Sequence, residues 1–347
     1  STLVHQLVDE GQLETKSTIR NGRRATLVRL AHNQGLGIGL WIAQRELKLA
    51  VVDFAKSIIA EHMLPLPLGH KADTTLERAI QLINETMTNI DADPGEIAGI
   101  GVALAAPVAI GNHMIAIPGV MPGWDGFDIV SPLSATFNTP VYVDNDANYA
   151  AYCESRMGAA IGKRDFVYIS TNDNVGAGIV AGGEIMHGVT GLAGEIGHIH
   201  VRDEEWEHCN CGGVGCVEQI ASATGIAREA RRRMAAEETP SALRQYGDDV
   251  TAKDVLDAAK AGDELALSVV ETVGRYLGLT LATIAMTVDP QMFVIGGGVS
   301  KAGQFLIDII DKYYQHYTPI SENKGIIGLA KLGNDAGIYG AARLVLD

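Results

Sequence analysis

The chain has 347 residues, of which 47% are hydrophobic and 20% are charged, and its formal net charge is −15. This length and composition indicate a folded globular protein that is too long for one small core, so we expect two lobes and a further module. The negative charge argues against nucleic-acid binding by the chain as a whole, and the lack of an apolar run of about eighteen residues argues against a membrane span.

The amino-terminal segment differs in charge from the rest. Residues 1–30 contain five Lys and Arg against three acids, a balance of +2, so residues 31–347 carry −17. The start is neither a signal peptide nor an initiator Met, and we expect that sequence preceding Ser1 is missing or was processed. A short basic N-terminal segment followed by a long acidic one is typical of a DNA-binding module joined to a ligand-binding domain, although an ordinary solvated terminus fits the charges too.

Within this segment the pattern changes from helix to hairpin. Residues 2–9 place apolar side chains on one helix face, and residues 13–20 and 25–30 read as strands around Asn21-Gly22, a strong turn signal. A helix followed by a basic hairpin is the second half of a winged helix; the alternative is a hairpin that docks on the body. Arginines beside the turn would hold DNA phosphates or enter a minor groove: Arg20, Arg23 and Arg24.

From residue 37 onward, strands alternate with amphipathic helices, which indicates α/β lobes. Hairpins beginning near residues 37 and 166 predict that one unit occurs twice, as in the two-lobed actin/hexokinase/Hsp70 fold, with the ligand in the cleft between the lobes. We assign the apolar face of the helix at 263–287 to the core rather than to a subunit interface. The expected strands are 37–41, 47–53, 97–104, 141–143, 166–170 and 175–180, and the expected helices are 74–89, 223–237, 251–261, 263–287, 300–316 and 335–346.

A cluster of cysteines follows the second hairpin. Cys209, Cys211 and Cys216 lie within eight positions, and His198 lies eleven residues before the first of them. Three thiolates and an imidazole can surround one tetrahedral ion, and zinc suits this ligand set. A disulfide between Cys209 and Cys211 would close too small a ring. We therefore predict a structural zinc site, and cysteines kept as metal ligands indicate a reducing cytoplasm.

The segment around this site, Gly194 to Ser222, resembles the signature of the ROK family (repressors, open reading frames and kinases for sugars), and the resemblance covers nearly the whole chain. Three further segments carry it: residues 143–148 resemble the catalytic NDAN segment, residues 118–124 the PNLPGW segment with Gly119 in place of Asn, and residues 294–298 the glycine motif on the nucleotide side.

The resemblance implies an α/β, two-lobed actin/hexokinase-like (ribonuclease H-like) fold with an N-terminal partial winged-helix segment. We expect the end of a winged helix-turn-helix domain at 1–30. Lobe I would then comprise 31–147 with 333–347, and lobe II, with the zinc loop, would comprise 148–332.

The resemblance also implies which residues bind the sugar. Carboxylates and amides accept hydrogen bonds from neighbouring hydroxyls, so they recur in carbohydrate sites. His198 would bind zinc through one ring nitrogen, and the ion would fix the loop that carries two of the acids. Taken alone, residues 144–146 would read as an Asx-rich turn. The expected sugar-binding residues are Asn145, Asp146, Glu195, His198 and Glu218, and Asp146 matches the general base of the family's kinases.

The nucleotide side departs from those kinases. Their DxGGTK hairpin aligns with residues 41–46, so Trp41 stands where the aspartate belongs and Ala43-Gln44 replace two glycines. Thr171 to Gly178 replaces a Gly-Thr-Gly-type stretch and resembles repressors of glucose and N-acetylglucosamine metabolism; Asp173 would repel phosphate. These changes predict sugar binding without phosphorylation, so we expect no enzyme activity.

The sequence therefore predicts a sugar-responsive transcription regulator. A sugar or sugar-phosphate effector would close the cleft and change how the intact protein binds operator DNA. Because two DNA-binding modules that contact a nearly palindromic operator must be related by two-fold symmetry, we expect a homodimer or a dimer of dimers. Two alternatives stay open: a glucokinase-like sugar kinase with Asp146 as general base, and a sugar-binding protein without a DNA role.

Overall fold

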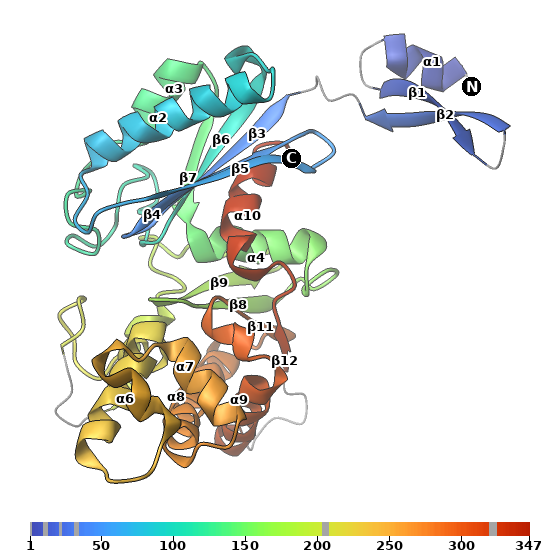
Figure 1. The fold of residues 1–347 in the computed structure, drawn as a ribbon. Helices are drawn as coiled ribbons and strands as arrows, with labels where there is room; N and C mark the ends of the chain where they lie inside the picture. Colours follow the sequence, from blue (N-terminus) through green and yellow to red (C-terminus); the bar gives the residue numbers. More distant parts are fainter. Residues whose placement is uncertain (1, 10–12, 21–22, 31–34, 203–207, 319–324) are drawn as a thin grey trace.

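The computed structural model describes residues 2–9, 13–20, 23–30, 35–202, 208–318 and 325–347, which form an N-terminal module and two lobes (Figure 1). The module consists of α1 (Thr2–Asp9), β1 (Leu13–Arg20) and β2 (Arg23–Leu30). The two strands are antiparallel, with Arg20 opposite Arg23 and Ile19 opposite Arg24. The expected helix and hairpin strands are thus present, whereas the Asn21-Gly22 turn lies outside the described residues.

Lobe I is built on a five-stranded sheet with the order β5-β4-β3-β6-β7. β3, β4 and β5 are antiparallel neighbours, while β3, β6 and β7 are parallel. Helices α2 (Ala72–Asn89) and α3 (Val130–Phe137) lie over one face (Figure 1), and α10 (Ala336–Leu344) packs on β3 and β6. The strands are β3 (Leu36–Ile42), β4 (Glu46–Val52), β5 (Ile58–Pro65), β6 (Ile97–Leu104) and β7 (Val141–Asn145).

Lobe II repeats this plan with the strand order β10-β9-β8-β11-β12. β8, β9 and β10 are antiparallel neighbours, and β8, β11 and β12 are parallel. The same order and directions in both sheets confirm the predicted duplication and the actin-like, two-lobed fold. The elements are β8 (Phe166–Thr171), β9 (Val175–Ala181), β10 (Glu184–Ile185), α5 (Glu218–Ala221), α6 (Ala223–Ala236), α7 (Ala252–Lys260), α8 (Glu264–Val288), β11 (Met292–Gly296), α9 (Gln304–Tyr317) and β12 (Ile326–Leu329).

Helix α8 is the central helix of lobe II. Within the described part of the chain it is the one helix long and apolar enough to cross a membrane, but 61% of its apolar window is buried inside the lobe. A Cβ on Gly278 would lie 2.6 Å from Cβ of Tyr313, so α8 and α9 meet almost backbone to backbone. The assignment of the apolar face of α8 to the core is confirmed, since all five predicted residues are buried: Val269, Val270, Leu277, Leu281 and Ile284.

Two helices join the lobes. α4 (Asp146–Met157) packs on β8 and β9 of lobe II and against α10, which itself packs on the sheet of lobe I. Glycines make both approaches possible: a Cβ on Gly39 would lie 2.4 Å from the carbonyl oxygen of Ile338, and a Cβ on Gly178 would lie 2.3 Å from that of Ala147. The two sheets are therefore separated by a layer of two closely packed helices.

The chain crosses between the lobes after α4 and again before α10. The two crossing segments form hydrogen bonds with the same buried carboxylate. Glu154 is fully buried. Its Oε2 accepts the backbone N–H of Ala159 at 2.6 Å, and its Oε1 accepts those of Lys331 and Leu332, each at 2.9 Å. The domain boundaries expected after residues 147 and 332 remain a prediction.

Candidate functional site

The junction between β7 and α4 places two polar side chains between the lobes. Asn145 is the N-cap of α4: its side-chain oxygen accepts the N–H of Ala147 at 2.8 Å, and its amide donates to the carbonyl of Ala106 at 3.1 Å. Asn is favoured at this position because its side chain satisfies a backbone donor that the helix leaves unpaired. The cap fixes Asn145 and starts α4 at Asp146.

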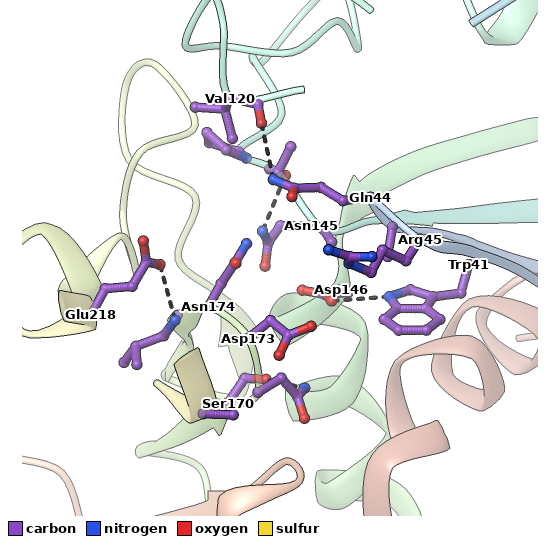
Figure 2. Close-up of a pocket in the computed structure, with 18 of the residues that line it drawn as sticks. Trp41, Gln44, Arg45, Val120, Asn145, Asp146, Ser170, Asp173, Asn174 and Glu218 are labelled. Carbon is purple, nitrogen blue, oxygen red and sulfur yellow. Dashed lines mark hydrogen bonds between the residues drawn. The ribbon is translucent and has the colours of Figure 1, made fainter. Parts of the chain in front are cut away.

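A cavity of about 280 Å³ lies next to this junction. It is lined from both lobes and gathers all five residues predicted to bind sugar: Asn145, Asp146, Glu195, His198 and Glu218. Figure 2 shows Asn145 and Asp146 on one side of the cavity and Glu218 on the other. The structure thus brings these residues together, while their contact with a sugar stays a prediction.

Asp146 is held by a residue of β3, which is separated from β7 by one strand in the sheet of lobe I. The indole Nε1 of Trp41 donates to its Oδ2 at 3.0 Å (Figure 2). Burial raises the pKa of Asp146 to about 6, although hydrogen bonds from Trp41 and the Ala147 N–H act in the opposite direction. A carboxyl group with a pKa near neutrality can take a proton from a ligand and release it again.

Two glutamates face Asp146 from lobe II. The pKa of Glu195 is raised to about 7, mainly by burial and further by the charges of Asp146 and Glu218. Burial also raises the pKa of Glu218, whose Oε2 accepts the N–H of Val175 at 3.1 Å and leaves Oε1 for a ligand. Three carboxyl groups around one small cavity suit a ligand that donates several hydrogen bonds, such as a ring of hydroxyls.

The predicted zinc ligands also come together. The ligand atoms of His198, Cys209, Cys211 and Cys216 all lie within 4.8 Å of one another. Nδ1 of His198 is 3.5 Å from Sγ of Cys209, and Sγ of Cys211 is 3.7 Å from that of Cys216. Tetrahedral zinc with bonds of about 2.3 Å to sulfur and about 2.0 Å to nitrogen requires edges of about 3.8 and 3.5 Å, so the cluster can hold such an ion.

The metal cluster and the cavity share one residue. While Nδ1 of His198 faces the cysteines, its Nε2 is 3.8 Å from Oε2 of Glu195, and both residues line the cavity. A metal at Nδ1 would fix the ring and thereby the side of the cavity that Glu195 occupies.

The remaining wall of the cavity is formed by the segments that depart from the kinase motifs. Trp41, Gln44 and Arg45 come from the β3–β4 hairpin, and Asp173 and Asn174 from the β8–β9 turn (Figure 2). Three further polar residues that line the cavity lie outside the recognised motifs, and such isolated residues give no signal in the sequence: Lys48, Ser170 and Asn334.

The predicted DNA-binding arginines lie elsewhere. Arg20 ends β1, and Arg23 and Arg24 begin β2, so the backbone places all three at the turn end of the hairpin in the N-terminal module. A DNA contact through them stays a prediction.

Comparison with known proteins shows the family to which this architecture belongs. The model of the ROK family matches residues 37–347. A glucokinase of Halalkalibacterium halodurans is 36% identical over 89% of this chain and 94% of its own. The crystal structure of a ROK family glucokinase from Streptomyces griseus, in complex with glucose and AMPPNP, superimposes with a TM-score of 0.77 at 30% identity, covering 89% of this chain and 99% of that one. A xylose repressor of Caldicellulosiruptor bescii is 24% identical over 100% of this chain and 88% of its own.

These similarities correct one expectation. The altered phosphate motifs led us to expect no enzyme activity, but relatives that are 31–36% identical along the body are glucokinases. The altered phosphate motifs are two short segments, whereas the similarity to the glucokinases extends over both lobes. The expectation of a protein without enzyme activity is therefore wrong.

Proposed function

Because the chain belongs to the ROK family, we propose that its interlobe cavity binds a hexose and that Asp146 accepts a proton from one sugar hydroxyl as that hydroxyl is phosphorylated. The observation that carries this proposal is the placement of Asp146: a half-buried carboxyl group with a pKa of about 6 that faces the sugar-binding acids across the cavity.

The sugar would be held from both lobes. Asn145 and Asp146 would contact it from lobe I, and Glu195, His198 and Glu218 from lobe II. A neutral sugar fits this set better than an anion does, because carboxylates repel negative charge and accept hydrogen bonds from hydroxyls.

Proton transfer follows from the pKa of Asp146. At neutral pH most of the molecules carry the carboxylate form, which can take the hydroxyl proton while the oxygen attacks the phosphoryl group. The hydrogen bond from Trp41 fixes one carboxylate oxygen, Oδ2, and so orients the carboxylate towards the cavity. Arg45 is a cation on the same wall (Figure 2) and would face a phosphoryl group, since a guanidinium pairs well with phosphate oxygens.

A coupled assay with Mg-ATP and a panel of hexoses tests this function. We expect turnover of at least one hexose, and a fall in kcat on the order of 10²–10⁴-fold in Asp146→Asn, with the KM for the sugar nearly unchanged. Asp257→Asn, which makes the same change at an exposed acid of α7 outside the cavity, is the control. Turnover that persists in Asp146→Asn, or a protein that phosphorylates none of the hexoses, would contradict the proposal.

We also propose that zinc occupies the cluster formed by His198 and the three cysteines. The distances between ligand atoms and the soft character of three thiolates support zinc over a hard cation. The ion would stabilise the loop behind the sugar site. The use of free thiols as ligands also supports a reducing, cytoplasmic location.

A second function is favoured by the N-terminal module. The glucokinase similarities cover 89–90% of this chain, whereas the similarity to the xylose repressor covers 100% of it. The helix and hairpin of residues 2–30 also match the second half of a winged helix. We propose that the intact protein binds operator DNA through Arg20, Arg23 and Arg24, as a homodimer or a dimer of dimers, and that the sugar is its effector.

This second function is tested with the intact protein. DNA fragments are selected from the genome, and affinity is measured at stated salt with and without the hexose identified above. We expect sugar to change the DNA affinity by at least about five-fold, the lower range of allosteric coupling. Equal affinities with and without sugar would exclude the sugar as effector, and a mass that corresponds to a monomer would exclude the symmetric assembly.

A further inference from the structure

The loop of residues 186–195 connects β10 to the cavity and is folded back onto lobe II. The N–H of Met186 donates to the carbonyl of Ile179 at 2.8 Å, and the N–H of Ala177 donates to that of Gly194 at 2.8 Å. Within the loop, the N–H of Ala193 reaches the carbonyl of His187 at 3.2 Å. These bonds fix both ends of the loop to β9, and its last residue, Glu195, lines the cavity.

The middle of this loop reaches across to lobe I. Gly191 has a φ of +86°, and a Cβ there would lie 1.9 Å from the carbonyl oxygen of Val108, just beyond β6. Next to this contact, Nε2 of His187 is 2.8 Å from Oδ2 of Asp144, in β7. Asp144 holds the pKa of His187 above its ordinary value by accepting this hydrogen bond. The loop is therefore attached to lobe I by a backbone contact and by one polar pair.

Asp144 in turn organises the start of α4. Its Oδ1 accepts the N–H of Asn145 at 2.7 Å and the side-chain amide of Asn148 at 2.8 Å. Asn148 is buried, and among the described residues its Oδ1 has no hydrogen-bond partner. Rotating its amide by half a turn would exchange the nitrogen for this oxygen and place the oxygen against the carboxylate of Asp144. The orientation of the amide is therefore fixed. Both oxygens of Asp144 are thus engaged, one with the helix start and the other with the loop of lobe II.

We propose that His187 and Asp144 form a positioning pair that fixes the two halves of the sugar site relative to each other. The loop carries Glu195 on the side of lobe II, and the helix start carries Asn145 and Asp146 on the side of lobe I. Neither member of the pair lines the cavity, so they act through the residues that do. This inference rests on the proposed function where it is measured through sugar binding.

Two substitutions of His187 separate positioning from packing. His187→Phe keeps a ring but removes the donor, whereas His187→Gln keeps a donor of similar reach. We expect His187→Phe to raise the Kd and the KM for the hexose by about ten-fold, and the KM for Mg-ATP to stay within about two-fold, since the pair spans the sugar side. We expect His187→Gln to stay within about two-fold of wild type, as should the control His62→Gln on exposed strand β5.

A measurement without sugar keeps the inference distinct from the proposed function. Hydrogen exchange on the ligand-free protein should show that His187→Phe speeds exchange in both 186–195 and 144–148, while the peptides that contain the cysteine cluster keep their wild-type rates. If these two segments respond together but the wild type binds no hexose, the proposed function is wrong and the pair stands. If exchange in 144–148 is unchanged, or if His187→Phe binds hexose as tightly as wild type, the positioning role is wrong.

Discussion

At the scale of single residues, Asp146 links the chemistry of the site to the stability of the protein. Its pKa rises from 3.8 to about 6 because the folded protein buries it. The folded state therefore favours the protonated form, and the stability that this provides is complete below pH 3.8 and is lost as the pH rises through about 6. At neutral pH the buried charge weakens the fold, by up to about 3 kcal/mol for a shift of this size and by less where the cavity admits water.

The substitution Asp146→Asn should therefore stabilise the protein at pH 7.5 and leave its stability nearly unchanged near pH 4, where wild-type Asp146 is largely protonated. Thermal unfolding at the two pH values checks this, with Asp173→Asn as control. A melting temperature that rises equally at both pH values would contradict the assignment to a buried charge.

The same titration predicts that kcat rises with pH through about 6, because the carboxylate form accepts the hydroxyl proton.

The cysteine cluster carries a second prediction at this scale. Cys211→Ser removes one of four ligands, so we expect loss of the metal and a fall in sugar affinity on the order of 10–100-fold, because His198 and Glu195 lose their fixed positions. Metal analysis and calorimetry with the hexose check this. Cys153→Ser, at a buried cysteine in α4 outside the cluster, should keep both properties. Wild-type sugar affinity in the metal-free variant would contradict the supporting role of the ion.

At the scale of elements, contacts between helices matter as much as the composition of each helix. Alanine normally favours a helix over glycine by about 1 kcal/mol. At Gly278 of α8, however, an added Cβ would lie 2.8 Å from the backbone nitrogen of Tyr314 and 2.9 Å from the carbonyl oxygen of Ile310. We expect Gly278→Ala to destabilise lobe II by about 1–3 kcal/mol through overpacking, seen as a lower melting temperature. Met286→Ala, on the half-exposed side of the same helix, should change it little, and a Gly278→Ala variant as stable as wild type would refute the close contact.

The helices and strands that could be predicted from the sequence are those with a strongly periodic pattern of hydrophobic residues. The strand at 97–104 was predicted with the bounds that it has, and α6 to α10 were each predicted within a few residues. β5 was missed because it is an edge strand with exposed residues on both faces, which breaks the alternation. α4 was missed because its buried face holds small and polar residues, among them Asn148 and Glu154, which a hydrophobic pattern does not register.

The site was predictable to the extent that motifs carried it. The five sugar-site residues lie in two recognisable segments, 143–148 and 194–222, and the fold brings them to one cavity. The bonds between Trp41 and Asp146 and between His187 and Asp144 join residues 105 and 43 positions apart. No local pattern encodes such pairs, because the first depends on how the strands of lobe I are arranged and the second on how the lobes pack against each other. The similarity to kinases, which covers 89–90% of the chain, likewise outweighed the two altered phosphate segments.

At the scale of the whole molecule, the N-terminal hairpin separates the two proposed functions. If the intact protein binds DNA, replacing Arg23 and Arg24 with Ala should weaken binding to all sequences similarly and reduce the slope of log affinity against log salt by about 2. Fluorescence anisotropy over a salt series checks this, with Lys253→Ala on the exposed surface of α7 as control. Hexose turnover should be unchanged in the double variant. A salt slope equal to that of wild type would show that these arginines do not contact phosphate.

The carboxylate of Glu154 forms hydrogen bonds with both segments that connect the lobes. These bonds determine the pivot of any motion that closes one lobe onto the other. Atoms beside a pivot barely move, whereas those far from it sweep an arc that grows with their distance. The start of β3 lies close to this pivot, since a Cβ on Gly37 would lie 2.1 Å from the carbonyl oxygen of Ala342, and Nη1 of the next residue, Arg343, is 3.9 Å from Sγ of Cys153 in α4. A rotation around a bound sugar would thus leave the start of β3 nearly in place and would move the walls of the cavity, which lies at the opposite end of α4, with no refolding of either lobe.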